Sequence, residues 1–391
     1  MARKMKDSGI EWIGVIPEGW RTINPKALFT QRKDKAQKGE RQLTSSQQYG
    51  ILYQDDYMEL TGSKVVTVEK DFDILKHVEA GDFVISMRSF QGGLEYSTKS
   101  GAISSAYVML VPNLELVYPR FYRWLLKSSV YIDALQRTTN MVRDGQAMRY
   151  SNFAQVRLFT LPLDEQKSRA DFLDLECSSI DKILFETRSS IEEYKKLKQA
   201  VITQAVTKGV RGEREMKNSG NPWFGQIPTD WKLSRVGLHF SIILGKMLCN
   251  APLNDTYTLE PYYCAADVHF DGVADGERKK MWFSPIEKDL YRVSVGDLLV
   301  VEGGAGAGGS AIVENQDSYT YIQNSIMIVR SKGNADNRYL RYLLEFLVKQ
   351  GYIDVVCNKA TIPHFTKDKL SCVPFCLCGE QEEIADYLDA K

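Results

Sequence analysis

Apolar and polar residues alternate in some stretches of this chain and recur every three or four residues in others. A period of two residues is typical of a strand with one buried face, and a period of 3.6 is typical of an amphipathic helix. We expect strands at residues 82–87, 106–111, 297–302 and 325–329, and amphipathic helices at residues 119–129 and 337–349. Both kinds of element occur in each half of the chain, so the sequence predicts the α+β class, with mixed or antiparallel sheets plus helices.

A third pattern fills the middle of the chain. No Gly or Pro interrupts the stretch from Asp164 to Lys208, and Gly209 stands where a glycine commonly ends a helix. Apolar residues recur there at alternating steps of four and three, which is the seam of a coiled coil. The seam residues are Leu173, Cys177, Ile180, Leu184, Thr187, Ile191, Tyr194, Lys198, Val201 and Ala205.

This pattern predicts one long coiled-coil helix, which would measure roughly 60 Å at the rise of an α-helix. The alternative is an amphipathic helix that packs along its own domain. The length and the regular heptads favour the coiled coil.

The sequence also repeats itself. The opening Met5-Lys-Asp-Ser-Gly returns as Met216-Lys-Asn-Ser-Gly, and a Trp-x-Gly-x-Ile-Pro-x-x-Trp segment follows it both times. Tryptophan is rare, and the interval from Trp12 to Trp223 is the same as the interval from Trp20 to Trp231. Repetition at a fixed interval indicates two copies of one structural unit.

Later motifs continue the match with small shifts that loops of different length would explain. They are Gly81–Asp82 with Gly296–Asp297, Arg120–Leu126 with Arg338–Leu344, Leu161–Pro162 with Val373–Pro374, Glu165–Gln166 with Glu380–Gln381, Asp171 with Asp386, and Leu173–Asp174 with Leu388–Asp389. Because both copies share these residues, we expect them, and the four tryptophans above all, to build the scaffold core.

The two copies and the long helix define the expected domain organisation. Residues 1–163 form the first copy, residues 164–209 the long spacer helix, and residues 210–379 the second copy. Residues 380–391 match the start of the spacer, so we expect them to begin a second spacer helix that is truncated.

A coiled-coil seam requires a partner. We expect the spacer interface to contain Leu173, Ile180, Leu184, Ile191, Tyr194 and Val201. The partner helix must then come from another chain, which includes self-association through the spacer, or the spacer must lie on another protein.

The composition excludes several classes of protein. Hydrophobic residues make up 43% of the 391 residues, which argues against long disorder. Seven cysteines without a repeated framework indicate a reducing compartment. There is neither an N-terminal signal segment nor an apolar run of about 18 residues. We therefore expect a cytoplasmic protein.

One motif resembles a nucleotide-binding loop. Residues 304–309 satisfy GxGxxG after an apolar strand, but a dinucleotide site also requires that a helix begin at once. The residues that come next, Ser310-Ala-Ile-Val313, predict another strand, so a hairpin loop is the better interpretation. The sequence also lacks a Walker GxxxxGK[ST] loop and an Asn/Asp-Pro-Pro-aromatic methyltransferase tetrapeptide. We expect no catalytic residues and no enzymatic activity of the chain alone.

The cysteines near the C-terminal end suggest a metal site only superficially. Cys372, Cys376 and Cys378, with Cys357 and His364 before them, do not follow the C-x2-C spacing of structural zinc sites. We expect buried, reduced cysteines and no metal ligands.

Taken together, the repeated opening, the Gly-Asp-apolar strand, the Glu-Gln motif and the long helix resemble the specificity subunit, HsdS, of type I restriction-modification systems. The likeness covers essentially the whole chain. It implies two target-recognition domains held apart by a spacer of paired antiparallel helices, with each domain binding one half of a bipartite DNA site. It also implies a subunit without catalysis of its own.

The resemblance implies several partners. They are double-stranded DNA, DNA adenine methylation (M) subunits and a restriction motor-nuclease (R) subunit. It implies no cofactor on this chain, because S-adenosylmethionine, ATP and magnesium belong to the partner subunits. The alternative function is a non-catalytic assembly or decoy scaffold of the same family that binds DNA weakly because its spacer is truncated.

The charge distribution only partly agrees with DNA binding. The chain has 50 Lys and Arg residues against 50 Asp and Glu residues, although a DNA-binding protein usually has a basic face. Residues 1–163 are mildly basic, with 22 basic against 17 acidic residues. Only this part of the chain therefore carries the expected excess.

Basic and amide side chains on loops are the candidates for contacts with phosphates and base edges. In the first copy they are Arg32, Lys33, Lys35, Arg88, Ser89, Gln91, Asn140, Arg143, Gln146 and Arg149. In the second copy they are Lys246, Lys279, Lys280, Asn324, Asn358, Lys359, Thr361 and His364. Any single member is also explained as a solvated surface residue. The tryptophans could stack on bases, but two copies that read different half-sites would not share them.

Overall fold

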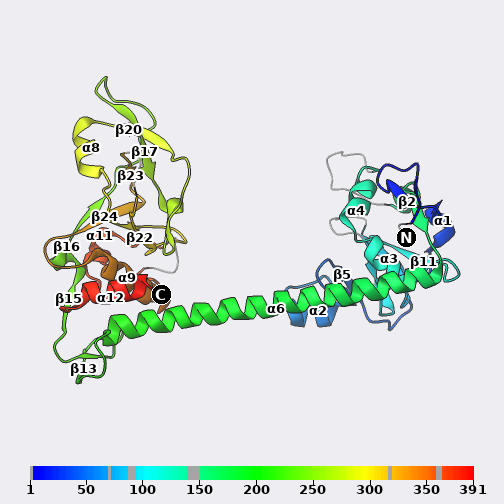
Figure 1. The fold of residues 1–391 in the computed structure, drawn as a ribbon, viewed down its shortest axis with the longest axis horizontal. Helices are drawn as coiled ribbons and strands as arrows, with labels where there is room; N and C mark the ends of the chain where they lie inside the picture. The colour runs from blue at the N-terminus through cyan, green and yellow to red at the C-terminus, as the bar shows by residue number, and fades with distance from the viewer. Residues whose placement is uncertain (1–2, 69–71, 87–93, 139–148, 316–318, 358–362) are drawn as a thin grey trace. The chain divides into compact units, whose positions relative to one another are not determined.

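The structure is a computed structural model that describes residues 3–68, 72–86, 94–138, 149–315, 319–357 and 363–391 (Figure 1). The chain divides into two compact units, Met1–Glu186 (unit 1) and Thr187–Lys391 (unit 2). The division falls inside helix α6, Leu163–Lys208, which enters both units.

The core of unit 1 is an antiparallel four-stranded sheet. Its order is β4 (Phe29–Arg32), β11 (Tyr107–Pro112), β8 (Phe83–Ser86) and β9 (Glu95–Tyr96). The described residues of unit 1 also form four two-stranded pairs: β1 (Met5–Asp7) with β2 (Val15–Pro17), β3 (Arg21–Ile23) with β12 (Leu158–Thr160), β5 (Leu43–Ser46) with β6 (Gly50–Tyr53), and β7 (Lys76–Val78) with β10 (Gly101–Ile103).

Unit 1 also contains short helices. They are α1 (Pro25–Leu28), α2 (Gln54–Thr61), α3 (Pro119–Leu125), α4 (Ser129–Gln136) and α5 (Tyr150–Phe153). Aromatic rings fill the space between sheet and helices, because Phe29 makes edge contacts with Phe83, Tyr122 and Phe153 at centroid distances of 5.4–5.8 Å.

Unit 2 has an equivalent antiparallel sheet and a second, smaller one. The first contains β16 (Phe240–Leu244), β24 (Ile326–Ser331), β21 (Leu298–Val301) and β22 (Ser310–Ile312), and the second contains β20 (Lys280–Phe283), β17 (Thr258–Tyr263) and β23 (Tyr321–Ile322). β17 and β23 are parallel, so unit 2 is mixed. The remaining pairs are β13 (Met216–Asn218) with β14 (Gln226–Pro228), β15 (Lys232–Arg235) with β25 (Pro374–Leu377), and β18 (Val268–His269) with β19 (Gly272–Val273).

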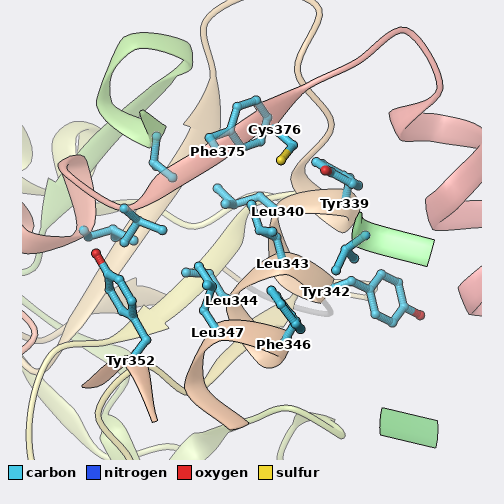
Figure 2. Packing of buried hydrophobic residues seen from close by; sticks show 14 of the residues in the cluster. Tyr339, Leu340, Tyr342, Leu343, Leu344, Phe346, Leu347, Tyr352, Phe375 and Cys376 are labelled. Carbon is cyan, nitrogen blue, oxygen red and sulfur yellow. The ribbon is translucent and has the colours of Figure 1, made fainter. Parts of the chain in front are cut away.

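The helices of unit 2 are α7 (Val236–His239), α8 (Pro285–Tyr291), α9 (Asn337–Lys349), α10 (Tyr352–Val356), α11 (Lys367–Ser371) and α12 (Gln381–Asp389). Helix α9 spans the residues that the apolar pattern predicted. Figure 2 shows its residues Tyr339, Leu340 and Leu343 on the side toward Phe375 and Cys376 of β25. These side chains are buried, which explains why the helix has such a regular apolar stripe.

Strand pairing shows that the two units share one topology. Phe29 of β4 pairs with Pro112 of β11, and Phe240 of β16 pairs with Ser331 of β24. The other edge of β11 pairs with β8, as the other edge of β24 pairs with β21. The order β4-β11-β8-β9 therefore corresponds to β16-β24-β21-β22, and residues at corresponding positions of the two units are equivalent.

The repeated residues make repeated contacts. Trp12 packs edge-on against Tyr131 at a centroid distance of 5.4 Å, and Trp223 packs in the same way against Tyr352 at 5.3 Å. Trp20 and Trp231 are buried. The prediction that the tryptophans belong to the scaffold is confirmed.

The repeated Glu-Gln motif attaches a helix to each unit. Gln166 of α6 accepts a hydrogen bond from the backbone N–H of Tyr118 (2.8 Å), and Gln381 of α12 accepts one from the backbone N–H of Asp336 (3.0 Å). Two further ion pairs are equivalent, namely Arg120 with Asp174 and Arg338 with Asp389. The start of α6 and helix α12 are thus the same element in two copies.

Two predictions from the sequence are wrong, one about the match between the copies and one about the end of a helix. Leu161–Pro162 does not correspond to Val373–Pro374, because Pro162 follows strand β12 whereas Pro374 begins strand β25. The expected helix 119–129 ends at Leu125, since the Ser128 hydroxyl donates to the Leu125 carbonyl (2.7 Å) before α4 begins.

Helix α6 is continuous for 46 residues. It ends at Lys208 because Gly209 adopts a left-handed conformation with φ of 77°. Every residue from 178 to 198 is exposed, so the helix does not pack along its own domain over this stretch. The prediction of a long helix between two sheet-rich domains is confirmed. No helix in the described part of the chain is long and apolar enough to cross a membrane.

Candidate nucleic-acid interface

Four segments of unit 2 meet at one end of the sheet β16-β24-β21. The backbone N–H of Asn324, just before β24, donates to the carbonyl of Lys246, just after β16 (2.8 Å). At the end of β21, Glu302 donates its N–H to Ser325 (2.8 Å), and its carbonyl accepts the N–H of Phe365 (2.6 Å). Loops from distant parts of the sequence therefore form one surface.

His364 is at the same place. A β-bridge joins it to Gly303, and its side chain is 61% exposed. Its Nδ1 lies 3.9 Å from Glu302 Oε2, and Lys369 donates to its carbonyl (2.7 Å). The structure thus brings together three of the residues predicted for the second copy, His364, Lys246 and Asn324, beside the glycine-rich loop.

The equivalent end of the unit 1 sheet carries the basic residues that follow β4. Lys33 and Lys35 are exposed. The Lys35 ammonium donates to the Asp73 carbonyl (2.6 Å), and a backbone bridge joins Lys35 to Lys76. Each of these lysines can therefore reach a phosphate group from a fixed backbone position.

Lys35 and Lys246 occupy equivalent positions but have different surroundings. Lys246 is only 9% exposed, and its ammonium pairs with Glu287 (2.6 Å) and donates to the Trp282 carbonyl (2.8 Å). Burial raises the pKa of Glu287, but hydrogen bonds from Lys246 and Ser284 outweigh it and hold the pKa below its ordinary value. Lys246 thus has a structural role.

Arg32 also has a structural role. Its guanidinium makes two hydrogen bonds to the buried carboxylate of Asp82 (2.7 and 3.1 Å), and its side chain is 19% exposed. The hydrogen bond to Asp82 raises the pKa of Arg32 despite partial burial. Because the guanidinium is already paired, Arg32 is a weaker candidate for DNA than its neighbours.

The other described candidates are on the surface. Arg149 is exposed at the start of α5, and Lys279 and Lys280 are exposed at the start of β20. Asn324 is half-buried in the turn before β24. Nine candidates lie outside the described residues: Arg88, Ser89, Gln91, Asn140, Arg143, Gln146, Asn358, Lys359 and Thr361. Their contacts with DNA stay predictions, as do those of the described candidates.

The glycine-rich loop is a hairpin. The strand β22 begins at Ser310, as expected, and no helix follows the loop. Gly304 donates its N–H to the Pro363 carbonyl (3.2 Å), and a Cβ on Gly308 would lie 2.8 Å from Val348. Glycine is needed there because its backbone packs closely against the side chains of Val348 and Ile353.

The cysteines do not form a ligand set. Burial raises the pKa of the Cys376 and Cys378 thiols to about 12. Cys357 is buried and Cys372 exposed. Within the described ranges no group of three His, Cys, Asp or Glu side chains is arranged to hold a metal ion.

Sequence reasoning missed one polar cluster beside the unit 1 surface. The His77 ring lies between two carboxylates, with Nδ1 3.0 Å from Glu40 and Nε2 3.0 Å from Glu79. The backbone N–H of His77 donates to Asp34 (3.0 Å), so the cluster fixes the segment that carries Lys33 and Lys35. No local motif signals this cluster, because Glu40 is far from His77 in the sequence.

Comparison with known proteins identifies the fold. One chain of a structure described as "Structural basis underlying complex assembly and conformational transition of the type I R-M system" matches with a TM-score of 0.66 and 16% identity, over 96% of this chain and 90% of that chain. The HsdS subunit from Thermoanaerobacter tengcongensis matches with a TM-score of 0.53 and 16% identity, over 96% and 89% of the two chains. No protein-family model and no curated protein match the chain. The chain has the fold of HsdS, the S subunit of type I restriction-modification systems, as the sequence resemblance implied.

Proposed function

We propose that the chain is the DNA specificity subunit of a type I restriction-modification enzyme and has no catalytic activity of its own. One observation carries this proposal: two equivalent units share the long helix α6. The units have the same scaffold contacts but different residues at one end of each sheet. Two similar units with different surfaces suit a bipartite DNA site whose half-sites differ.

In unit 1 the reading surface would contain Lys33 and Lys35, together with the segments 88–91 and 140–149. Lysine ammonium groups neutralise phosphates without regard to sequence, whereas Arg, Asn and Gln side chains discriminate bases in the major groove. The lysines would therefore supply affinity, and residues such as Arg88, Gln91 and Asn140 would supply sequence discrimination.

In unit 2 the surface would contain His364 and Asn324 at the end of the larger sheet, and the segment 358–361. Lys279 and Lys280 of β20 would add phosphate contacts. Lys246 and Arg32 are left out of the proposed contacts because each is paired with a carboxylate.

The partners would supply the chemistry. Methylation subunits would bring S-adenosylmethionine, and a motor-nuclease subunit would bring ATP and magnesium, so this chain needs no cofactor. A contact surface for another subunit is available on α6, where Ile180, Leu184, Ile191 and Tyr194 are each at least 47% exposed. Leu173 and Val201 are half-buried at the ends of the same seam. Apolar side chains this exposed on one face indicate a protein contact.

Selection from randomised duplexes tests the proposal. The chain, alone and with its methylation subunits, is incubated with duplexes of random sequence, and bound DNA is sequenced. We expect enrichment of two short motifs at a fixed separation. A mixture of chain and partners that enriches no sequence would contradict the proposal and favour an assembly or decoy protein.

A matched pair of variants shows which unit reads which motif. Lys33→Ala with Lys35→Ala should weaken binding without changing the enriched bases, while Arg88→Ala should relax one motif only. Methylation of DNA by the purified chain alone would refute the non-catalytic role.

A further inference from the structure

The segment that follows strand β16 in unit 2 exposes two neighbouring apolar side chains. Met247 is 75% exposed and Leu248 is 53% exposed, and Leu244 at the end of the strand is 38% exposed. Single exposed apolar residues are common on protein surfaces, but adjacent ones on one short segment indicate a contact with another molecule. The segment belongs to the candidate nucleic-acid interface, because it follows Lys246 directly.

Backbone hydrogen bonds fix this segment on both sides. The Lys246 carbonyl accepts the N–H of Asn324 (2.8 Å), and the Cys249 carbonyl accepts the N–H of Trp282 in β20 (3.0 Å). The two apolar residues are the ones between these bonds. They are therefore held between the turn before β24 and strand β20.

Gly245 allows the chain to come this close to the turn. A Cβ at this position would overlap the carbonyl oxygen of Gln323 and would lie 2.7 Å from that of Ile322. The N–H of Gly245 donates to the carbonyl of Ile326 (3.0 Å). Tight backbone contacts thus set the place of the apolar pair, so its side chains start from fixed positions at the interface.

Unit 1 has a different chemistry at the equivalent positions. By the strand register, Met247 corresponds to Ala36 and Leu248 to Gln37. The segment 33–38 of unit 1 contains three lysines, all of them exposed. The equivalent segment of unit 2 has one lysine, which is buried. The same edge of the fold is therefore cationic in unit 1 and apolar in unit 2.

Basic residues beside the apolar pair favour DNA as the molecule that it contacts. Lys279 and Lys280 are exposed at the start of β20, the strand that bonds to Cys249. Residues 216–391 as a whole contain 18 basic against 22 acidic residues, so unit 2 attracts phosphates less than unit 1 does. Such a surface depends more on base contacts, and apolar side chains contact the methyl group that marks thymine in the major groove.

We propose that Met247 and Leu248 contact thymine methyl groups in the major groove of the half-site that unit 2 reads. This inference rests on the proposed function, since it names the base that one part of the reading surface recognises. The flexible methionine side chain can adapt to a base edge. Each methyl group that the contact removes from water strengthens binding about fourfold.

Deoxyuridine tests the proposal, because it lacks only the methyl group of thymidine. The probe is the duplex that the chain enriches together with its methylation subunits, and dissociation constants are measured by fluorescence anisotropy. Thymines are replaced in one half-site at a time, and the unit 2 half-site is the motif that Arg88→Ala leaves unchanged. We expect replacement there to weaken binding about fourfold for each thymine contacted.

Variants of the chain assign the methyl contact to the apolar pair. Met247→Ala with Leu248→Ala should weaken binding to the thymine duplex, and replacement by deoxyuridine should then cause no further loss. Leu238→Ala is the matched control. Leu238 is 69% exposed just before β16, at the other end of the same strand, so its change should leave both dissociation constants as they were. Thermal melts check that each variant is folded.

Several results would overturn the proposal. A unit 2 half-site without thymine, or a deoxyuridine effect that persists in Met247→Ala with Leu248→Ala, would exclude the methyl contact. A double variant that binds DNA normally but no longer associates with methylation subunits in light scattering would make the pair a protein contact. Bipartite sequence selection without a deoxyuridine effect would overturn this inference alone, whereas the absence of sequence selection would overturn it together with the proposed function.

Discussion

Unit 1 and unit 2 have the same strand order and the same helix attachments, yet they differ where each sheet ends. In unit 2 the position after β16 holds Lys246, buried and paired with Glu287. In unit 1 the equivalent lysine, Lys35, is exposed beside Lys33. Residues that both units share keep the fold, and residues that differ change the surface. The difference therefore locates the surface on which recognition can diverge without loss of the fold.

The buried aspartates Asp82 and Asp297 also combine a contact that both units share with a contact that differs between them. Asp82 and Asp297 each accept an N–H from three residues earlier, at 3.0 and 2.8 Å. Their arginine partners come from different strands, Arg32 from β4 and Arg330 from β24. The turn fixes the carboxylate, and the guanidinium that compensates it can come from the adjacent strand, as in unit 2, or from the strand beyond it, as in unit 1.

The largest expected effect compares the fully buried Trp231 of unit 2 with its counterpart in unit 1, Trp20. Trp231→Ala should destabilise unit 2 by about 4 kcal/mol, because it removes a fully buried ring under the end of α6. Trp20→Ala should cost unit 1 about 1–2 kcal/mol less, since no helix end covers Trp20. Hydrogen exchange of β24 and β11 reports each unit separately. Equal losses would mean that the end of α6 adds nothing to unit 2.

The second effect concerns the two ion pairs between a buried aspartate and an arginine. Asp82→Asn and Asp297→Asn should each destabilise their own unit by about 2 kcal/mol, because each removes the buried carboxylate that pairs with a guanidinium. Arg32 then keeps only its ion pair with Asp34, whose side chain is 64% exposed. Double-mutant cycles with Arg32→Gln and Arg330→Gln measure the coupling in each pair. If only one pair shows coupling, the two arginines are not equivalent partners.

The third effect separates exposed from buried lysines. Lys33→Ala with Lys35→Ala should reduce the slope of log DNA affinity against log salt concentration by the amount expected for about two phosphate contacts. The stability of unit 1 should stay unchanged. Lys246→Ala should instead destabilise unit 2 and leave the salt dependence as it was. Titrations of a fixed duplex at several salt concentrations, with thermal melts in parallel, distinguish the two. A lower salt slope in Lys246→Ala would contradict its structural role.

The smallest effect is the pH dependence that His77 gives to the stability of unit 1. Burial opposes the charged form of His77, but hydrogen bonds to Glu79 and Glu40 raise its pKa above the ordinary value. The folded state thus binds the proton more tightly than the unfolded state. The resulting stability is fully present below the ordinary histidine pKa and is lost as pH rises through the raised one.

His77→Gln should flatten this dependence, by less than about 1 kcal/mol because the ion pairs are near the surface. Unit 2 has Arg292 at the equivalent position, over the ring of Tyr319, so the His77 contribution has no counterpart there. Hydrogen exchange of each unit from pH 6 to pH 8 measures both. An equal pH dependence in the two units would exclude His77 as its source.

Several elements followed from local patterns in the sequence. Helix α9 spans the residues that the apolar stripe predicted, and strand β22 follows the glycine loop as the run of apolar residues indicated. The long helix begins within one residue of its expected start and ends at Lys208. The spacing of apolar residues and the residues that begin or end an element are local properties of the sequence. They therefore do not depend on contacts with distant segments.

Other features depended on contacts between distant residues. Arg32 meets Asp82 50 residues later, and Lys246 meets Glu287 41 residues later. No periodicity reveals such pairs, so both basic residues were predicted to be surface residues that contact DNA. The mismatch between Leu161–Pro162 and Val373–Pro374 has the same origin, because strand pairing and not sequence similarity sets the register.

The sequence by itself determined the repeat, the α+β class, the scaffold tryptophans and the long helix, because all of these depend on residue type and spacing. The tertiary structure alone decided which lysines are exposed, which arginine meets which aspartate, and that the end of α6 packs in one buried cluster with Trp231 of unit 2. Those outcomes depend on which segments become neighbours in space, and burial and charge pairing exist only after the segments have met.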